Sequence, residues 1–185
     1  DVTTTFTGPT SGADIYTPNA GYILGGTIGV ELNSRLRAEL ELSHSRWNMG
    51  SNVFEVTSMS FSGTLNRPGG YVEATYLLSN AWLNLTEGER ITPYVGGGVG
   101  VAWVNMNNTF AMMNAAGPSF AFQVGGGFTF AVSDQLSIDL GYRFKDVINP
   151  NLSPAANFTD PKTTDYFVDS NLASHNFQLG ITYRF

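Results

Sequence analysis

The sequence predicts an all-β fold, an up-and-down antiparallel barrel of eight strands that each cross a membrane. Three observations predict it. In residues 175–185 the aromatic and aliphatic side chains share one parity and Gln178, Gly180, Thr182 and Arg184 share the other, so a strand there has an apolar and a polar face. Only 13% of the residues are charged, roughly half the share in soluble globular proteins. Long and short connections also alternate along the chain.

Composition sets limits on the class of protein. The 185 residues fit a single domain spanning the whole chain. No run of apolar residues is long enough for a membrane-spanning helix, whereas a barrel that is apolar outside and polar inside has a mean hydropathy near the observed −0.05. The chain has no cysteine, so it has no disulfide and no thiolate metal site. A net charge of −6 with nine basic residues argues against nucleic-acid binding.

The first half of the chain gives four of the expected strands, at residues 2–7, 21–32, 35–47 and 71–85. The first is short and threonine-rich, and we expect it to pair with the last strand and so close the barrel. In the second and third, aliphatic residues alternate with glycine, threonine and charged residues. The fourth is ambiguous in phase; we favour Leu77, Ala81 and Leu83 outside, with Asn80 and Trp82 inside.

The second half gives the other four, at residues 91–104, 120–132, 136–145 and 175–185. Five glycines share the inward parity of two of these strands: Gly96, Gly98, Gly100, Gly125 and Gly127. A phosphate-binding loop is the alternative, but no lysine follows and no helix begins there. Glycine inside a strand more often allows large side chains to approach closely, so we expect these glycines to make room for Trp82, Tyr94 or the arginines.

The connections separate the two ends of the barrel. Residues 8–20, 48–70, 105–119 and 146–171 form long loops, and residues 33–34, 86–90 and 133–135 form short turns. This asymmetry is typical of outer-membrane barrels, which have tight periplasmic turns and long extracellular loops. It predicts that both termini lie on the periplasmic side.

Three stretches carry a family resemblance: TPYVGGGVGVA at 92–102, FQVGGGFTFAVSDQLSIDLGYRF at 122–144 and the terminal ITYRF. They resemble the OmpA/opacity-type small outer-membrane barrels of Gram-negative bacteria, whose closing strand ends in an aromatic residue, here with Tyr183 and Phe185 as the signature. The resemblance implies a location in the bacterial outer membrane and no cofactor. The chain departs from the family at its N-terminus, where a longer first strand is expected; its polar start and lack of a signal peptide suggest a processed or trimmed form.

The polar parity is expected to place four acids and four bases in the lumen: Glu31, Arg37, Glu39, Glu41, Asp139, Arg143, Lys145 and Arg184. Enclosed charges are tolerated only when they are paired, and an ion-selective pore shows an excess of one sign. Eight strands leave an interior that side chains can fill. A plug of ion pairs is therefore favoured over a narrow solute pore.

Two histidines raise the possibility of an enzyme, because small barrels that trim lipid A use His and Ser on the lipid-facing wall. Neighbours on a strand point to opposite faces, so His44 does not meet Ser43 or Ser45, and His175 has no Ser or acid two residues away. We expect no catalysis. His44 and Arg46 are instead candidates for contact with lipopolysaccharide, beside the outer-membrane lipids.

The long loops combine acidic with apolar residues. Asp160, Asp165 and Asp169 are weak calcium candidates, because they lack the spacing of an EF-hand loop. Exposed apolar clusters usually mark interaction sites, which indicates a protein partner or a homo-oligomer formed through these loops. We therefore expect a structural or surface-interaction role, of an adhesin or lattice-forming kind. A small pore is the alternative, a lipid A-modifying enzyme is a third hypothesis, and a soluble lipocalin-type barrel is the rival fold.

Overall fold

The computed structural model describes the backbone of residues 2–6, 12–56, 61–65, 70–108, 112–115, 117–154 and 171–185, and the side chains of 19–48, 70–107, 117–151 and 171–185. Nearly all of this backbone is extended. Among these residues there is no helix that is both long and apolar enough to cross a membrane.

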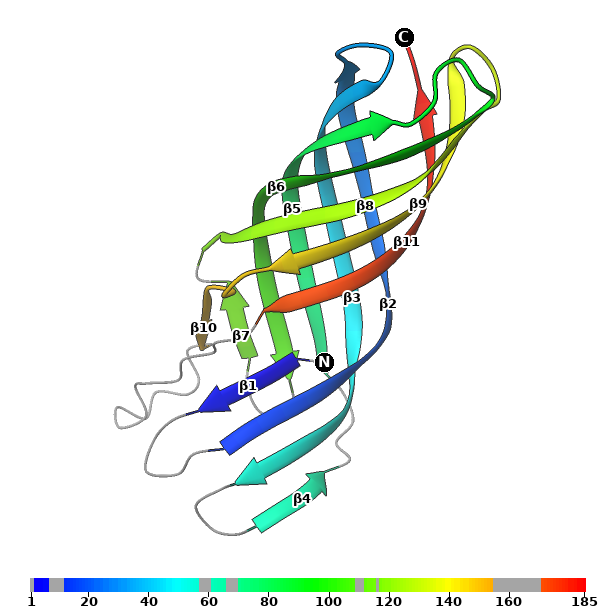
Figure 1. The fold of residues 1–185 in the computed structure, drawn as a ribbon. Helices are drawn as coiled ribbons and strands as arrows, with labels where there is room; N and C mark the ends of the chain where they lie inside the picture. Colours follow the sequence, from blue (N-terminus) through cyan, green and yellow to red (C-terminus); the bar gives the residue numbers. More distant parts are fainter. Residues whose placement is uncertain are drawn as a thin grey trace.

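The described strands form one antiparallel sheet that curls into a near-closed barrel (Figure 1). Seven long strands make its wall, in the order β2 (Gly12–Glu31), β3 (Leu36–Val56), β5 (Gly70–Asn84), β6 (Ile91–Asn108), β8 (Ser119–Ala131), β9 (Leu136–Val147) and β11 (Leu172–Tyr183). Each strand pairs with the next long strand along the chain. The prediction of an all-β, antiparallel up-and-down barrel is confirmed.

The predicted count of eight strands is wrong. Residues 2–7 do contain a strand, β1 (Val2–Phe6), but it pairs with Gly12–Tyr16 of β2 and not with β11. With five residues it is shorter than the 9–11 or so that a tilted crossing requires. Its register places it beside the far end of β2, so the described wall has seven long strands. Among the described residues, no pairing covers the second edge of β2 from Gly21 to Glu31 or the second edge of β11.

Several predicted loops are shorter than expected because strands continue into them. β2 begins at Gly12 and β3 ends at Val56. The loop signal at Pro18 coincides with two shifts of register between β2 and β3, and a proline is tolerated in a strand at such an irregularity. Three short strands complete the sheet: β4 (Phe61–Leu65), β7 (Met112–Ala115) and β10 (Leu152–Pro154).

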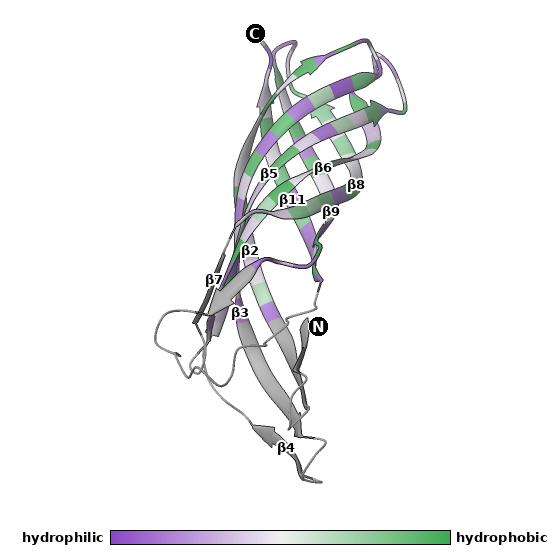
Figure 2. Cartoon of the chain, turned by 90° about the vertical axis from the view of Figure 1, so that its left-hand side faces the viewer, coloured by the Kyte–Doolittle hydropathy of each residue, from purple (hydrophilic) through white to green (hydrophobic). Residues whose placement is uncertain are grey.

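Alternation along each strand separates the two faces of the wall. In β5 the even-numbered residues from Val72 to Trp82 are buried, while Leu77 and Leu83 are exposed, which confirms the favoured phase of this strand. Large apolar residues are exposed around the whole outside of the barrel, and apolar and polar positions alternate along the strands (Figure 2). Such a surface is stable only against lipid or another apolar partner.

The barrel has two distinct ends. The turns after β2, β5 and β8 lie at one end, with the C-terminus (Figure 1); we call it the short-turn end and the opposite one the long-loop end. The interior changes along this axis. Toward the short-turn end it holds a polar tier of inward residues between Arg37 and Ser43 on β3 and between Asp139 and Lys145 on β9. Toward the long-loop end it holds an apolar tier: Val72, Ala74, Tyr76, Leu78, Ala102, Val104, Met106, Ala121, Val147 and Leu172.

Candidate functional site

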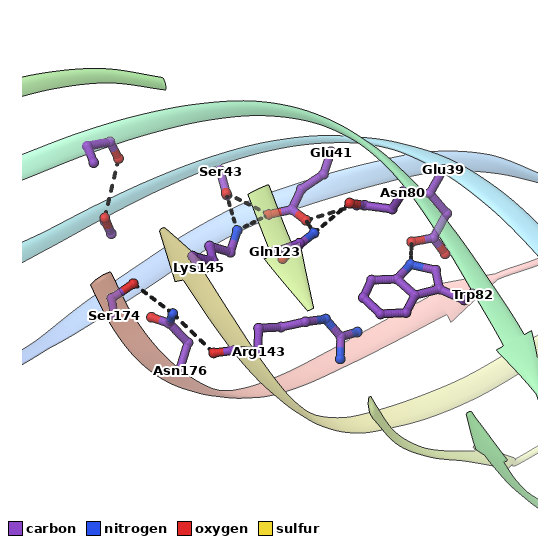
Figure 3. A network of polar contacts seen from close by, with 12 residues as sticks. Glu39, Glu41, Ser43, Asn80, Trp82, Gln123, Arg143, Lys145, Ser174 and Asn176 are labelled. Carbon is purple, nitrogen blue, oxygen red and sulfur yellow. Dashed lines mark hydrogen bonds and ion pairs between the residues drawn. The ribbon is translucent and has the colours of Figure 1, made fainter. Parts of the chain in front are cut away.

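The most organised feature of the molecule is its interior, and its centre is the pair of Glu41 and Lys145. β3 and β9 lie on different parts of the wall, and each turns one of these side chains inward (Figure 3). Lys145 is 0% exposed, and its Nζ contacts a Glu41 carboxylate oxygen and lies 3.1 Å from Ser43 Oγ. Its ammonium group also lies 4.8 Å from the centre of the Tyr76 ring. The ion pair therefore joins two walls across the lumen.

Three neutral side chains also donate hydrogen bonds to the Glu41 carboxylate. Ser43 Oγ donates to Oε1 at 2.7 Å. Asn80 Nδ2 and Gln123 Nε2 donate to Oε2 at 3.1 and 2.7 Å. A buried ion pair is stable only when the remaining oxygens and protons of both groups also have partners. Side chains of β3, β5, β8 and β9 supply partners for both Glu41 oxygens, whereas the buried Gln123 Oε1 has no hydrogen-bond partner among the described residues.

A second cluster lies closer to the short-turn end and is built on aromatic rings. The guanidinium carbon of Arg143 lies 4.0 Å from the Trp82 ring centre, and Arg143 Nη2 donates to the Tyr94 hydroxyl at 2.9 Å. Tyr94 in turn donates to Asp139 Oδ1 at 2.8 Å. Trp82 Nε1 donates to Glu39 Oε2 at 2.9 Å. Tyr94 thus links an arginine to an aspartate without direct contact between the two charges.

The other predicted lumen charges are also paired. Arg37 Nε lies 2.6 Å from Glu39 Oε1 on the same strand. Arg184 Nη2 lies 3.0 Å from Glu31 Oε1, but both side chains are about half exposed. All eight predicted residues lie on the inward parity, and the structure separates them by depth: the Glu41–Lys145 pair is buried and the Glu31–Arg184 pair lies at the mouth of the barrel.

The inward glycines make room for these large side chains, as predicted. A Cβ atom on Gly96 would lie 2.7 Å from a ring carbon of Trp82, and one on Gly125 would lie 2.8 Å from the Arg143 side chain. Both would also approach the neighbouring strand's carbonyl oxygens at 2.1 and 2.3 Å. Any larger residue at these positions displaces the ring or the guanidinium group.

Sequence reasoning missed the apolar tier. Tyr76, Leu78 and Val104 face the lumen and are almost fully buried, as is Leu172. The signal was present in residues 71–78, where both parities of β5 carry apolar residues and the phase was ambiguous for that reason. A segment that is apolar on both faces indicates a strand buried on both faces, here by lipid outside and by the packed lumen inside.

The lipopolysaccharide candidates lie on the outer wall, near the long-loop end. His44 Nδ1 lies 3.0 Å from Thr75 Oγ1. Arg46 Nη1 lies 3.1 Å from Glu73 Oε1, and its guanidinium carbon lies 3.8 Å from the Tyr71 ring centre. This polar row follows directly on the apolar outer positions of β3 and β5, and Arg46 already has an acidic partner.

Neither histidine contacts a serine among the described residues, and the hydroxyl partners of the two rings are Thr75 for His44 and Tyr142 for His175. His44 points outward while Ser43 and Ser45 are buried inside. Nδ1 of His175 lies 2.5 Å from the Tyr142 hydroxyl, within a set of outward rings that includes Phe144 and Phe177. Across the described residues, no three His, Asp or Glu side chains are placed to hold a metal ion. Asp160, Asp165 and Asp169 lie outside the described residues.

The signature residues of the closing strand lie outside the barrel. Tyr183, the last residue of β11, and Phe185, two residues beyond it, are both exposed and share the outward parity of Ile181. The whole outward parity of the last strand is therefore aromatic or aliphatic from His175 to the end.

A family model described as the outer membrane protein β-barrel domain matches residues 1–185. The chain belongs to this family. It is 31% identical over 122 residues to outer membrane protein PagN of Salmonella typhimurium, across 62% of the chain and 51% of that protein. It is 24% identical over 158 residues to an uncharacterized protein of Brucella suis, across 75% of the chain and 56% of that protein. The chain thus spans about half the length of these curated relatives.

The solved structures include a barrel of the same fold. The crystal structure of Neisserial surface protein A matches with a TM-score of 0.57 and 13% sequence identity over 95% of both chains. Together with the family model, this confirms the expected resemblance to small outer-membrane barrels and the location in the outer membrane. The exposed apolar wall is therefore a lipid-facing surface.

Proposed function

We propose that this outer-membrane barrel has a structural or surface-interaction role, exerted through its long-loop end, with no transport and no catalysis. In this proposal the long-loop end faces the exterior and the short turns and the C-terminus face the periplasm. Short periplasmic turns are the rule in bacterial outer-membrane barrels, and the three turns of the short-turn end, residues 32–35, 85–90 and 132–135, fit it.

The observation that carries the proposal is the filled lumen. Within the described residues, the Glu41–Lys145 cluster closes the middle of the barrel and the apolar tier fills the half toward the long-loop end. Ion conduction requires a continuous path of water or polar ligands. A lysine without any exposed surface, beneath packed valine, leucine and tyrosine side chains, interrupts that path.

The lack of catalysis rests on geometry in the described part of the wall. A serine nucleophile and its histidine base must lie within hydrogen-bond reach, and the wall separates His44 from Ser43 and Ser45, so that the described polar partner of His44 is Thr75. His175 has Tyr142 as its described polar partner. Neither histidine is paired with a serine there.

The outer wall contacts lipid in this proposal. Outer-membrane lipids cover the apolar positions, and lipopolysaccharide head groups lie against the polar row with His44 and Arg46. The Glu73 carboxylate beside Arg46 lowers the attraction of this row for phosphate. The row therefore supports positioning at the membrane boundary and not a high-affinity anion site.

The role of the loop predicted at residues 146–171 is tested by replacing part of it. The protein is expressed in a Gram-negative strain that lacks adhesins, and adherence to epithelial cells and autoaggregation are measured. We expect a gain in at least one of them, lost when residues 157–168 are replaced by a Gly-Ser linker. The control is Glu87→Ala in a short turn, which leaves both unchanged. Equal adherence of the linker variant and the parent would refute a role for that loop, provided that both fold in the membrane.

A further inference from the structure

A small antiparallel sheet continues the wall beyond the barrel at the long-loop end (Figure 1). It consists of β1, residues 12–16 of β2, residues 52–56 of β3, and β4, which pair in this order. β2 and β3 are 20 and 21 residues long, about twice the 9–11 residues that a tilted membrane crossing requires. This part, which we call the outer sheet, therefore projects from the membrane.

The outer sheet ends in an edge that its sequence does not protect. β4 pairs with β3 along one side, and no described strand pairs with its other side. Natural proteins protect such edges with lysine, proline or a β-bulge, because the free N–H and C=O groups of an edge can pair with another chain. β4 reads FSGTL, and residues 57–66 include no charged residue and no proline. The edge of β4 therefore offers its backbone groups to a partner strand.

The sequence of β4 is complementary to a second copy of itself. In an antiparallel pair that is symmetric about Gly63, Phe61 lies opposite Leu65 of the second copy, and Ser62 lies opposite its Thr64. Such a pair matches apolar with apolar residues and hydroxyl with hydroxyl residues, which stabilises antiparallel strands. The central residue is glycine, which in a strand often marks the close approach of another backbone. Symmetry about either neighbour of Gly63 would instead place this glycine opposite Phe61 or Leu65.

We propose that the free edge of β4 is a homophilic docking site, at which the chain pairs with a second copy of itself. The contact is isologous, because the same strand contributes from both copies. It joins the two outer sheets into one continuous sheet and gives hydrogen-bond partners to both free edges. The inference deepens the proposed surface-interaction role and rests on its orientation, in which the long-loop end faces the exterior.

The direction of the strands decides where the second copy lies. Two copies in one membrane are related by a two-fold axis along the membrane normal, whereas the two-fold axis of an antiparallel self-pair is perpendicular to the strand. β4 pairs with β3, a strand of the wall, and wall strands tilt by only about 35–45° from the barrel axis. The two axes therefore do not coincide, and the second copy belongs to an opposed membrane. Each contact is short, so many copies on both surfaces act together.

The test is disulfide formation between cells, since the chain has no cysteine. Phe61→Cys and Leu65→Cys are expressed in separate cultures of a Gram-negative strain with truncated lipopolysaccharide, and the cultures are mixed, pelleted and oxidised. We expect a disulfide-linked dimer, because opposite residues of an antiparallel pair have Cα atoms about 4.5–5.5 Å apart. Either culture alone should give at least tenfold less dimer, because the same residue of the second copy lies about 13 Å away along the strand.

The controls separate this register from mere proximity of the two surfaces. Gly63→Cys should form the dimer in a single culture, since residue 63 lies opposite itself. A mixture of Ser62→Cys with Leu65→Cys is out of register by one residue and should give at least tenfold less dimer than the matched mixture. Labelling of intact cells with a membrane-impermeant maleimide, together with the faster migration of unheated barrels on gels, verifies that each variant is folded with its cysteine outside.

Three results would overturn the proposal. Equal dimer yields, or none, from matched and mismatched mixtures of externally labelled variants would refute the pairing of β4 and leave the proposed orientation intact. Dimers that form only when both variants are made in the same cell would place the two copies in one membrane. Cysteines that the maleimide reaches only in broken cells would show that the long-loop end faces the periplasm, which refutes the orientation in the proposed function as well.

Discussion

At the scale of single residues, the Glu41–Lys145 pair is the most consequential contact in the lumen. Removing one partner of a buried ion pair leaves an uncompensated charge and costs about 3–5 kcal/mol. We expect Lys145→Met to lower the free energy of unfolding by this amount, because Glu41 then keeps only neutral donors. Urea-induced unfolding from lipid vesicles measures it.

The matched control is Arg184→Gln, which breaks the half-exposed pair with Glu31 and costs about 0–1 kcal/mol. The double variant Glu41→Leu with Lys145→Met should lower the free energy of unfolding by less than Lys145→Met alone, because no charge of the pair remains without its partner. Equal effects of Lys145→Met and Arg184→Gln would contradict the proposed role of the pair.

Glu87, in the turn after β5, offers a test by pH. The hydrogen bond and the charge of Arg35 hold the pKa of this carboxyl below its ordinary value. A carboxyl whose pKa is lowered in the folded state adds to the free energy of unfolding at pH values above its ordinary pKa. This contribution is lost as the pH falls through the lowered pKa. We expect the Glu87 carboxyl carbon to titrate at lower pH in the parent than in Arg35→Gln when followed by NMR. Identical titration curves would show that the turn contact does not form.

At the scale of elements, two adjacent residues of β5 face different environments, one the lipid and the other the lumen. Leu78 is 0% exposed in the apolar tier, while the side chain of Leu77 faces outward. Leu78→Ala should cost about 2–5 kcal/mol because a cavity remains in the packed interior. Leu77→Ala should cost less, because lipid chains fill the space it leaves. A reversed order in the same unfolding assay would contradict the assignment of the two faces.

The strands differ in how far their sequences determine them. Alternation located the seven long strands, because a slip by one residue would exchange the lipid and lumen faces. Residues 2–7 carry threonine on both parities, so their pattern does not define a partner, and the pairing with β11 was wrong. The extension of β2 past Pro18 was missed since its irregular register is set by contacts with β3.

The contacts in the lumen were likewise predictable only in part. Parity placed all eight charges on the inward face, because the strand period alone determines it. Which charges form a pair depends on their depth along the barrel axis and on which strands lie near one another. Glu41 on β3 and Lys145 on β9, for example, are far apart in the sequence. Spacing carries no such information. The Tyr94 link between Arg143 and Asp139 was missed for that reason.

At the scale of the whole molecule, we propose that the lumen is sealed. The buried Glu41–Lys145 pair and the apolar tier interrupt the described interior, and the exposed apolar wall fits the outer membrane. In the proposed function, the long-loop end is then the part that partners contact.

Planar-bilayer recording of the full protein shows whether the lumen conducts ions. We predict a closed membrane, with no stable unitary conductance in 1 M salt (about 3 Å Debye length, so that surface charge is screened). A known open porin in the same bilayers is the control for insertion and detection. Reproducible unitary steps from the parent protein would contradict the sealed lumen and favour the pore.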